Sequence, residues 1–348
     1  MQRVDGHHDG HHASSPDAAI LSAADLFKAY GPRPALKGLS FALRPGRVLG
    51  FLGPNGAGKT TAIRILTTIM EPDAGSFVVA GVSSRAYPLE IRRRIGVLPE
   101  NLGYPKHVTG VEYLTYFGQL YGRSAAQARS YAATLLEEVG LHKRAKSLVG
   151  TYSRGMKQRL GIARALVNDP AVVFLDEPTS GLDPRGQQQV LSLVRQIAQT
   201  RSAGVVLCSH LLWEVEQFCD EVIILSAGEV VAKGTVAEVT GQTRRDVLRV
   251  HVAPEAVAGA RLALAALPAV ADVRADGGPP GWLTVRLAAA PEGAGAPDGA
   301  DGAGAAARQA ASQIVDGLVR AGVPVLGFEA GGGRLHDVFL RVTEEARP

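Results

Sequence analysis

Cysteine is nearly absent from this chain, which has only Cys208 and Cys219 among its 348 residues. Two cysteines cannot build a framework of disulfides, and a zinc ribbon needs clustered ligands, so both classes of protein are excluded. Long apolar runs are also missing: no stretch approaches the roughly 18 apolar residues of a membrane-spanning helix, and no apolar signal segment opens the chain. We therefore expect a protein that neither crosses a bilayer nor carries an obvious export signal.

An excess of charge of one sign is lacking too, because 37 lysines and arginines stand against 33 aspartates and glutamates, a net charge of +4. A surface that binds nucleic acid needs clustered positive charge, so nucleic acid is not expected as a partner. Apolar residues make up 46% and charged residues 20%, which is ordinary for a soluble, folded chain. The length then suggests two or three domains.

The texture of the sequence divides the chain into three regions. Residues 1–19 are polar and aperiodic, which predicts a disordered tail whose four histidines either bind a divalent metal weakly or are simply solvated. Those histidines are His7, His8, His11 and His12. Residues 20–241 alternate short apolar runs with amphipathic stretches, the pattern of an α/β domain. The clearest runs are 47–53, 171–178, 204–210 and 221–228, and the first three end in polar clusters, where open α/β sheets carry their ligands.

Residues 242–348 predict a smaller C-terminal domain. Alternating apolar residues near 248–252 indicate a strand, followed by a helix at about 254–267 and strands near 270–275 and 282–288. A second helix at about 307–321 and a strand at 323–329 complete a β-α-β-β-α-β order, which predicts a small α+β ferredoxin-like accessory domain. The Gly/Ala-rich segment 289–306 predicts a flexible loop. No titratable cluster occurs in this region, so no chemistry is assigned to it.

Residues 53–60 match the phosphate-loop pattern G-x-x-x-x-G-K-[ST] at every fixed position, between an expected strand and an expected helix. The glycines allow backbone N–H groups to point at phosphate oxygens, and the helix adds its positive end. Lys59 would contact the β- and γ-phosphates, and the Thr60 hydroxyl would ligate Mg²⁺. A glycine-rich turn that matches by chance is the alternative. The ATP-binding residues expected here are Gly53, Pro54, Asn55, Gly56, Ala57, Gly58, Lys59, Thr60 and Thr61.

Two acids, Asp176 and Glu177, follow the apolar residues 172–175. Such a strand is buried on both faces in a parallel sheet, which places the acids at its end beside the phosphate loop. Successive strand residues point in opposite directions, so the two acids cannot do one job unless the strand ends there. We assign Asp176 to Mg²⁺, through water, and Glu177 to the attacking water. Two solvated acids that merely end a strand are the alternative.

Three further segments carry a resemblance to a known family. Residues 151–159, Thr-Tyr-Ser-Arg-Gly-Met-Lys-Gln-Arg, resemble the signature segment of ATP-binding-cassette (ABC) proteins. Residues 180–183, directly after the acids, and His210, which ends the next strand, fit the same family. Residues 20–241 therefore resemble a complete ATPase subunit, similar to bacterial drug-resistance and sodium-extrusion export subunits that work with separate ABC-2-type permeases. Residues 335–340 resemble the tail of that subgroup.

This resemblance implies the fold and the roles of further residues. The fold is a P-loop ATPase (RecA-like) core with a helical signature subdomain and an antiparallel β subdomain. Ser153 and Gly155 would complete, in trans, an ATP site held by a second protomer of a homodimer or pseudo-homodimer, and Asp183 would link the two sites. His210 would contact the γ-phosphate and Glu177, which with Lys59 make the catalytic set. Tyr30 would stack on adenine. An ordinary helix cap, a structural histidine and a core tyrosine are the alternatives for Ser153, His210 and Tyr30.

The chain departs from the family pattern at two positions. Glu100 stands where many relatives have a glutamine that reaches Mg²⁺ and senses the permease. A carboxylate is a good Mg²⁺ ligand, so Glu100 joins Thr60 and Asp176 as an expected metal-binding residue, although it adds negative charge near the γ-phosphate. The signature reads Ser-Arg-Gly-Met in place of Ser-Gly-Gly-Gln, and no role is assigned to Arg154.

The function implied is that of an ATPase, converting ATP and water to ADP and phosphate, peripheral at the cytoplasmic face of the cell membrane. Dimerisation on ATP would drive the separate permease through helices within 105–165, where Thr109 and Ser124 are expected caps. The cargo stays open among a drug, a lipid, a polysaccharide and an ion. One alternative is a soluble cassette ATPase acting on ribosomes or nucleic acid, but the sequence has one phosphate loop and no long coiled coil or zinc module. The other is a regulator without turnover, against which Asp176, Glu177 and His210 argue.

Overall fold

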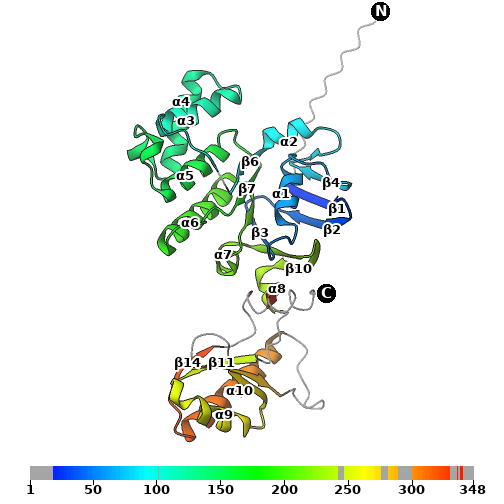
Figure 1. Ribbon diagram of the computed structural model, residues 1–348, viewed down its shortest axis with the longest axis vertical. Helices are drawn as coiled ribbons and strands as arrows, with labels where there is room; N and C mark the ends of the chain where they lie inside the picture. The colour runs from blue at the N-terminus through cyan, green and yellow to red at the C-terminus, as the bar shows by residue number, and fades with distance from the viewer. Residues whose placement is uncertain are drawn as a thin grey trace, which may run out of the picture. The chain divides into compact units, whose positions relative to one another are not determined.

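The computed structural model describes residues 19–100, 102–241, 247–275, 281–288 and 300–329, together with Leu335, Val338 and Phe339. The expected tail before residue 19, residues 289–299 of the expected loop, and positions 336, 337 and 340 of the family-like tail lie outside this part. The chain divides into two compact units, Met1–Val231 and Ala232–Pro348 (Figure 1). The division falls inside strand β10 (Glu229–Thr235), whereas the predicted domain limit follows residue 241.

A six-stranded sheet forms the centre of the first unit, in the order β10-β9-β3-β8-β7-β6. Strand β3 pairs in parallel with β8 and β9, and β7 pairs in parallel with β6 and β8. Every residue of β3 and β8 is buried, as expected for apolar runs covered on both faces. The carboxyl ends of these parallel strands therefore meet at one edge of the sheet. The remaining bounds are β3 (Val48–Leu52), β6 (Ile95–Leu98), β7 (Val172–Asp176), β8 (Gly204–Cys208) and β9 (Glu221–Ser226).

A second, antiparallel sheet has the order β2-β1-β4-β5 and confirms the expected antiparallel subdomain. Its strands are β1 (Leu21–Tyr30), β2 (Arg33–Leu43), β4 (Ala74–Val79) and β5 (Val82–Ser83). The turn between β1 and β2 contains Gly31 at φ 59°, a conformation that costs glycine little. Helices α1 (Lys59–Leu66) and α2 (Pro88–Arg94) follow β3 and β5 in the chain.

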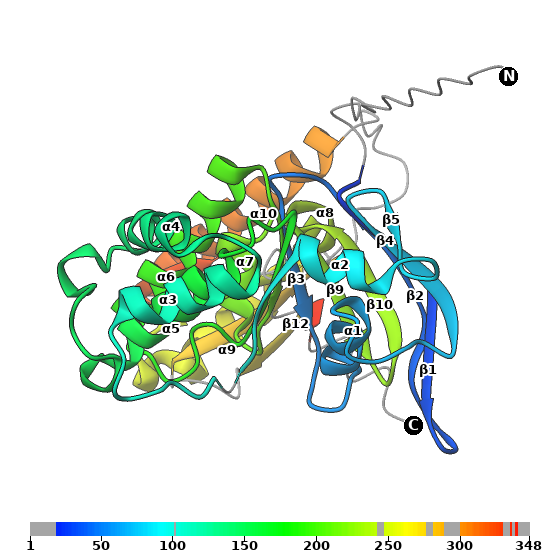
Figure 2. The same ribbon diagram turned by 90° about the horizontal axis from the view of Figure 1, so that it is seen from above.

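The helical subdomain holds α3 (Gly110–Leu120), α4 (Ala125–Glu138) and α5 (Arg154–Ala165), which Figures 1 and 2 show grouped together beside the central sheet. Two short 3₁₀ helices, His142–Arg144 and Val149–Thr151, lie between α4 and α5. The caps predicted from the sequence are present: Thr109 and Ser124 each form a full capping box with the residue three positions on. Local sequence therefore determines where α3 and α4 begin.

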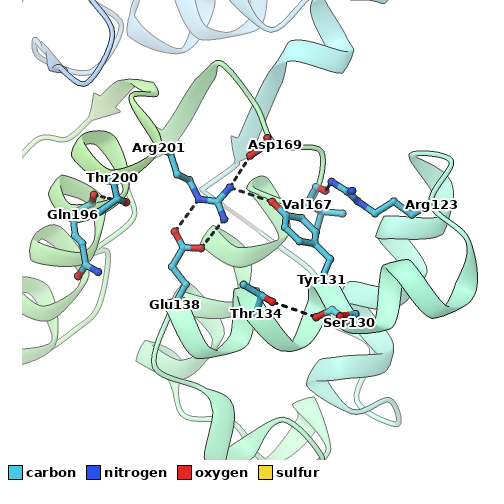
Figure 3. Close-up of polar contacts among 10 residues, drawn as sticks. All are labelled: Arg123, Ser130, Tyr131, Thr134, Glu138, Val167, Asp169, Gln196, Thr200 and Arg201. Carbon is cyan, nitrogen blue, oxygen red and sulfur yellow. Dashed lines mark hydrogen bonds and ion pairs between the residues drawn. The ribbon is translucent and has the colours of Figure 1, made fainter.

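Arg201, the last residue of α6 (Pro184–Arg201), joins this subdomain to the core (Figure 3). Its guanidinium donates to both carboxylate oxygens of Glu138 on α4, at 2.8 and 2.6 Å, and to the Tyr131 hydroxyl at 3.1 Å. A further N–H donates to Asp169, which lies between α5 and β7, at 2.8 Å. The Arg201 and Glu138 side chains are each only 18% exposed, so this is a largely desolvated, bidentate ion pair.

The second unit confirms the β-α-β-β-α-β order. Its sheet runs β12-β13-β11-β14 with antiparallel pairing throughout, which is the ferredoxin-like arrangement. Alternate residues of β11, Leu248, Val250 and Val252, are buried in its core. The elements are α8 (Val236–Gly241), β11 (Val247–Val252), a 3₁₀ turn (Pro254–Ala256), α9 (Val257–Ala265), β12 (Val270–Ala275), β13 (Trp282–Leu287), α10 (Ala300–Arg320) and β14 (Val325–Glu329).

One expectation for this unit was wrong. Helix α10 begins at Ala300, so residues 300–306 are helical and not part of a flexible loop. The segment was assigned to the loop for its glycines, but it is also rich in alanine, which has the most favourable helix propensity, and a long amphipathic helix follows it. Among the described helices of the chain, none is long and apolar enough to span a membrane.

Candidate active site

The phosphate loop connects the end of β3 to the start of α1, and two of its glycines are required by their surroundings. Gly53 has φ 155°, and a Cβ there would lie 2.4 Å from the Leu225 carbonyl oxygen. Gly58, the N-cap of α1, has φ 107°, and its Cβ would lie 2.4 Å from the Ala35 carbonyl oxygen. Any side chain at these positions would clash with backbone, so the loop can keep this path only with glycine.

A cleft of about 610 Å³ opens over this loop. It gathers residues from both sheets of the first unit, and it includes most of the residues that the sequence predicted for one ATP site. Gly53 and Pro54 do not line it, but their carbonyl oxygens accept from the Lys59 ammonium. The lining residues are Tyr30, Ala35, Asn55, Gly56, Ala57, Gly58, Lys59, Thr60, Thr61, Glu100, Asp176, Glu177, Ser180 and His210.

Lys59 is folded back over the phosphate loop. Its ammonium donates to the carbonyl oxygens of Gly53 at 2.5 Å and of Pro54 at 3.1 Å. The cationic Nζ therefore lies among the loop's backbone groups, beside the N-terminus of α1 with its unpaired N–H groups. Together they form a positively polarised cradle suited to an anion such as a phosphate group.

Three carboxylates face the cradle across the cleft. Asp176 is the last residue of β7, and its burial, together with the negative charges of Glu100 and Glu177, raises the pKa of its carboxyl. Lys59 and Arg64 act in the opposite direction. A hard cation bound here would relieve this repulsion, so oxygen donors fit Mg²⁺. Among the described residues no group of three His, Cys, Asp or Glu side chains forms a ready metal site, so the cation would also need ligands such as phosphate oxygens and water.

Glu177 and His210 form the second pair of the cleft. Glu177 has φ 50°, a left-handed conformation that is rare for residues other than glycine, and its N–H donates to the Cys208 carbonyl oxygen at 3.0 Å. Nδ1 of His210 lies 2.7 Å from Oε2 of Glu177. The His210 side chain is 59% exposed and that of Glu177 only 15%, so the histidine lies at the open side. This is the contact that the family resemblance implied, made between the ends of β8 and β7.

Tyr30 stands at the end of β1, where it lines the cleft with 46% of its surface exposed. Its hydroxyl donates to Sδ of Met70 at 3.3 Å. An exposed ring at the rim of the cleft does not fit the alternative of a core tyrosine.

Ser153, Gly155 and Asp183 do not line this cleft. Ser153 caps α5, its Oγ accepting from the Met156 N–H at 3.3 Å, and Asp183 caps α6, accepting from the Gly186 N–H at 3.2 Å. A Cβ on Gly155 would meet only Leu182 Cδ2, at an ordinary 3.8 Å. Packing within this chain therefore gives no reason for a glycine at position 155.

Two lining residues, Ala35 and Ser180, and the contact of Arg154 were not predicted from the sequence. Ser180 could have been found, since it stands in the family-like segment directly after the two acids. Nothing in the sequence marks Ala35, which is a small residue in β2, the edge strand of the antiparallel sheet. Nε of Arg154 donates to the Ser180 carbonyl oxygen at 2.8 Å. Its guanidinium lies against Gly181, where a Cβ would come within 2.3 Å of Cζ. Arg154 thus ties the start of α5 to the wall of the cleft.

The sheet order, the phosphate loop and the acids across from it define a nucleotide-binding P-loop ATPase domain of the cassette type. Residues 36–180 match the family model described as "ABC transporter". The linearmycin resistance ATP-binding protein LnrL of Bacillus subtilis (strain 168) is 36% identical over 66% of this chain and 73% of its own length. The daunorubicin resistance ATP-binding protein DrrA3 of Streptomyces coeruleorubidus is 39% identical over 70% of this chain and 77% of its own length.

Solved structures agree with these relatives. A structure described as the ATP-binding subunit of an ABC transporter is 32% identical, with a TM-score of 0.57, and covers 64% of this chain and 92% of that one. CbiO1 of Clostridium perfringens is 26% identical, with a TM-score of 0.60, and covers 65% of this chain and 92% of that one. The chain belongs to the ABC transporter family, as an ATP-binding subunit related to export ATPases. It is an ATPase, and subunits of this kind dimerise and pair with membrane permease components.

Proposed function

We propose that this chain hydrolyses ATP in the cleft above the phosphate loop and, as an ATP-closed dimer, drives a separate ABC-2-type permease that exports its cargo. The observation that carries the proposal is the facing arrangement of the phosphate cradle and the Glu177–His210 pair within one cleft. Peripheral association with the cytoplasmic face of the cell membrane follows from this role.

The functional side chains of the cleft have different roles in this scheme. Tyr30 offers its exposed ring to adenine, while the loop N–H groups and Lys59 hold the β- and γ-phosphates. Glu177 accepts a hydrogen bond from the attacking water and aims it at the γ-phosphorus, and His210 fixes the Glu177 carboxylate in that orientation. The water oxygen bonds to the γ-phosphorus while the P–O bond to the β-phosphate breaks, and the water's proton passes to Glu177, so inorganic phosphate leaves and ADP remains. Thr60, Asp176 and Glu100 would hold Mg²⁺, which, when bound, neutralises phosphate charge.

A second copy of the chain would complete the site. Ser153 at the N-terminus of α5 presents a hydroxyl and free backbone N–H groups, and Gly155 leaves room beside them for a phosphate held by the partner protomer. Asp183 would connect the two sites across the dimer. Loss of the γ-phosphate removes the bridge between the copies and reopens the dimer, and this change of state is what can do work on a permease.

The permease would be gripped through the capped helices α3 and α4 of the helical subdomain, which lie in the region where the family resemblance places the groove for a coupling helix. The cargo is a drug-like, lipid, polysaccharide or ionic substance. Drug-like compounds are favoured by the resistance named for the relatives LnrL and DrrA3. Co-expression with a candidate permease, followed by measurement of drug accumulation in cells, tests this part.

Glu177→Gln tests the assignment of the site. The amide keeps the shape of the side chain but cannot take up the water's proton, so phosphate release should fall by about a hundredfold or more. ATP binding should persist, and light scattering should show a dimer in ATP. Glu255→Gln, which changes an exposed carboxylate in the second unit, serves as the control and should leave turnover unchanged. Full ATPase activity of Glu177→Gln, or a monomer in ATP even beside the permease, would contradict the proposal.

A further inference from the structure

Glu214 is a fully buried carboxylic acid that the proposed mechanism does not use. It lies in α7 (Leu212–Phe218), directly after the His210 turn, with 0% of its surface exposed. Acidic side chains are almost never buried completely unless they are paired. One oxygen, Oε2, accepts from the Ser209 hydroxyl at 2.6 Å, and the same Ser209 oxygen accepts from the Leu211 N–H at 3.0 Å. Glu214 is therefore hydrogen-bonded to the turn Ser209–His210–Leu211 through the Ser209 hydroxyl.

The other oxygen of Glu214 has an unused hydrogen-bonding capacity. Oε1 is buried without a hydrogen-bond partner in this structure, and so is the hydroxyl of Thr179. Burial raises the pKa of the Glu214 carboxyl, while the hydroxyls of Ser209 and Thr179 lower it, so Thr179 lies within reach of this acid. Two orphaned polar atoms are unfavourable singly, and a hydrogen bond from Thr179 to Oε1 satisfies both.

Thr179 belongs to the turn that carries Glu177. The structure shows that turn to be conformationally demanding: Glu177 has φ 50°, and the Ser180 N–H donates back to its carbonyl oxygen at 3.1 Å. Unfavourable backbone conformations persist only where the surroundings hold them. The side chain of His210, in turn, is 59% exposed, so packing around it gives it little support. Glu214 accepts a hydrogen bond from Ser209 of the His210 turn and lies within reach of Thr179 of the Glu177 turn, so one buried group can support both turns.

We propose that Glu214 is a positioning residue for hydrolysis: it holds the His210 turn through Ser209 and the Glu177 turn through Thr179, and so keeps the two side chains 2.7 Å apart. The inference rests on the proposed roles of Glu177 and His210. It makes Glu214 act through these residues and not on ATP itself, so its removal should affect the catalytic step and leave nucleotide binding intact.

The test measures steady-state ATPase kinetics of the full-length chain. Glu214→Ala should lower kcat by about tenfold or more with KM for ATP changed less than about twofold. Glu214→Gln should restore kcat to within about threefold, because its amide oxygen can accept from Ser209 while its NH₂ donates to the Thr179 oxygen. Thr179→Val, which keeps the shape but removes the hydroxyl, should lower kcat severalfold and decides the matter if Glu214→Ala does not fold. Glu255→Ala is the surface control.

A second mutant background separates positioning from general stability. In His210→Ala, the further change Glu214→Ala should reduce kcat by a clearly smaller factor than in the wild type, because one of the two residues through which it acts is already gone. An undiminished effect in that background, or normal kcat in both Glu214→Ala and Thr179→Val, overturns the inference. Glu177→Gln is measured in the same series. If this variant retains turnover, the proposed function fails and this inference fails with it. If Glu177→Gln loses turnover while Glu214→Ala keeps a normal kcat, the inference alone is overturned.

Discussion

Asp176 illustrates how a single residue can be unfavourable for stability and useful for function. Its carboxyl is partly buried at the end of β7, close to the charges of Glu100 and Glu177, and the pKa of this carboxyl is raised from the ordinary 3.8. A raised pKa means that the ionised form is less favourable in the folded chain than in the unfolded one. The repulsion is acceptable at a site where a cation is to be bound.

Asp176→Asn should therefore stabilise the nucleotide-free protein while it impairs magnesium-dependent turnover. Because the folded-state pKa is raised, the wild type loses stability as the pH rises from about the ordinary value of 3.8 through the folded pKa. The variant should be more stable at pH 7, by less than about 1 kcal/mol after solvent screening. Its advantage should shrink as the pH is lowered towards 4. Urea unfolding over this pH range measures it; an equal or larger advantage at the acid end would contradict the argument.

At the scale of elements, Arg201 determines how α4 is held against the end of α6. Its bidentate contact with Glu138 is formed at low exposure, and Asp169 and Tyr131 satisfy further guanidinium donors. These hydrogen bonds and the Glu138 charge raise the pKa of Arg201, so its guanidinium stays protonated. The neighbouring Arg123 lies 4.2 Å from the centre of the Tyr131 ring, which adds a cation–π contact to the same junction.

Arg201→Ala should lower the free energy of unfolding by about 3 kcal/mol, because it leaves the Glu138 carboxylate poorly solvated and unpaired. A double-mutant cycle with Glu138→Ala should give a coupling of about 1–3 kcal/mol in urea denaturation. The pair Arg93–Glu90 is the control: its side chains are 75% and 46% exposed, so Arg93→Ala should cost less than about 0.5 kcal/mol. Equal losses for the two arginines would show that burial does not decide the effect.

At the scale of the whole molecule, one chain contains only part of the proposed catalytic unit. The cleft has groups suited to phosphate on one side, while the start of α5, capped by Ser153, does not line the cleft of the same chain. In the proposed function, each copy of a dimer completes the site of the other.

Gly155→Ala tests this arrangement. Within the chain the new methyl group has room, 3.8 Å from Leu182, and alanine is the better helix former. We expect unchanged or slightly higher thermal stability and normal ATP binding, but turnover reduced by about tenfold or more and a weaker ATP-dependent dimer in the Glu177→Gln background. Calorimetry, nucleotide titration and light scattering measure the three quantities. Wild-type turnover in Gly155→Ala would contradict close approach of a phosphate at this position.

Features that depend on a few neighbouring residues could be predicted from the sequence alone. The phosphate loop needs glycine where backbone would meet a Cβ, the capping boxes of Thr109 and Ser124 are complete within four residues, and apolar runs become buried parallel strands. Even there, composition misled at residues 300–306, where helix propensity outweighed the glycines. Tertiary structure alone decided what depends on distant segments: the place of Ala35 in the cleft wall, the ion pair of Arg201 with Glu138, and the complete burial of Glu214. No local pattern encodes these contacts, because each arises only when the sheet brings the ends of separate strands and helices together.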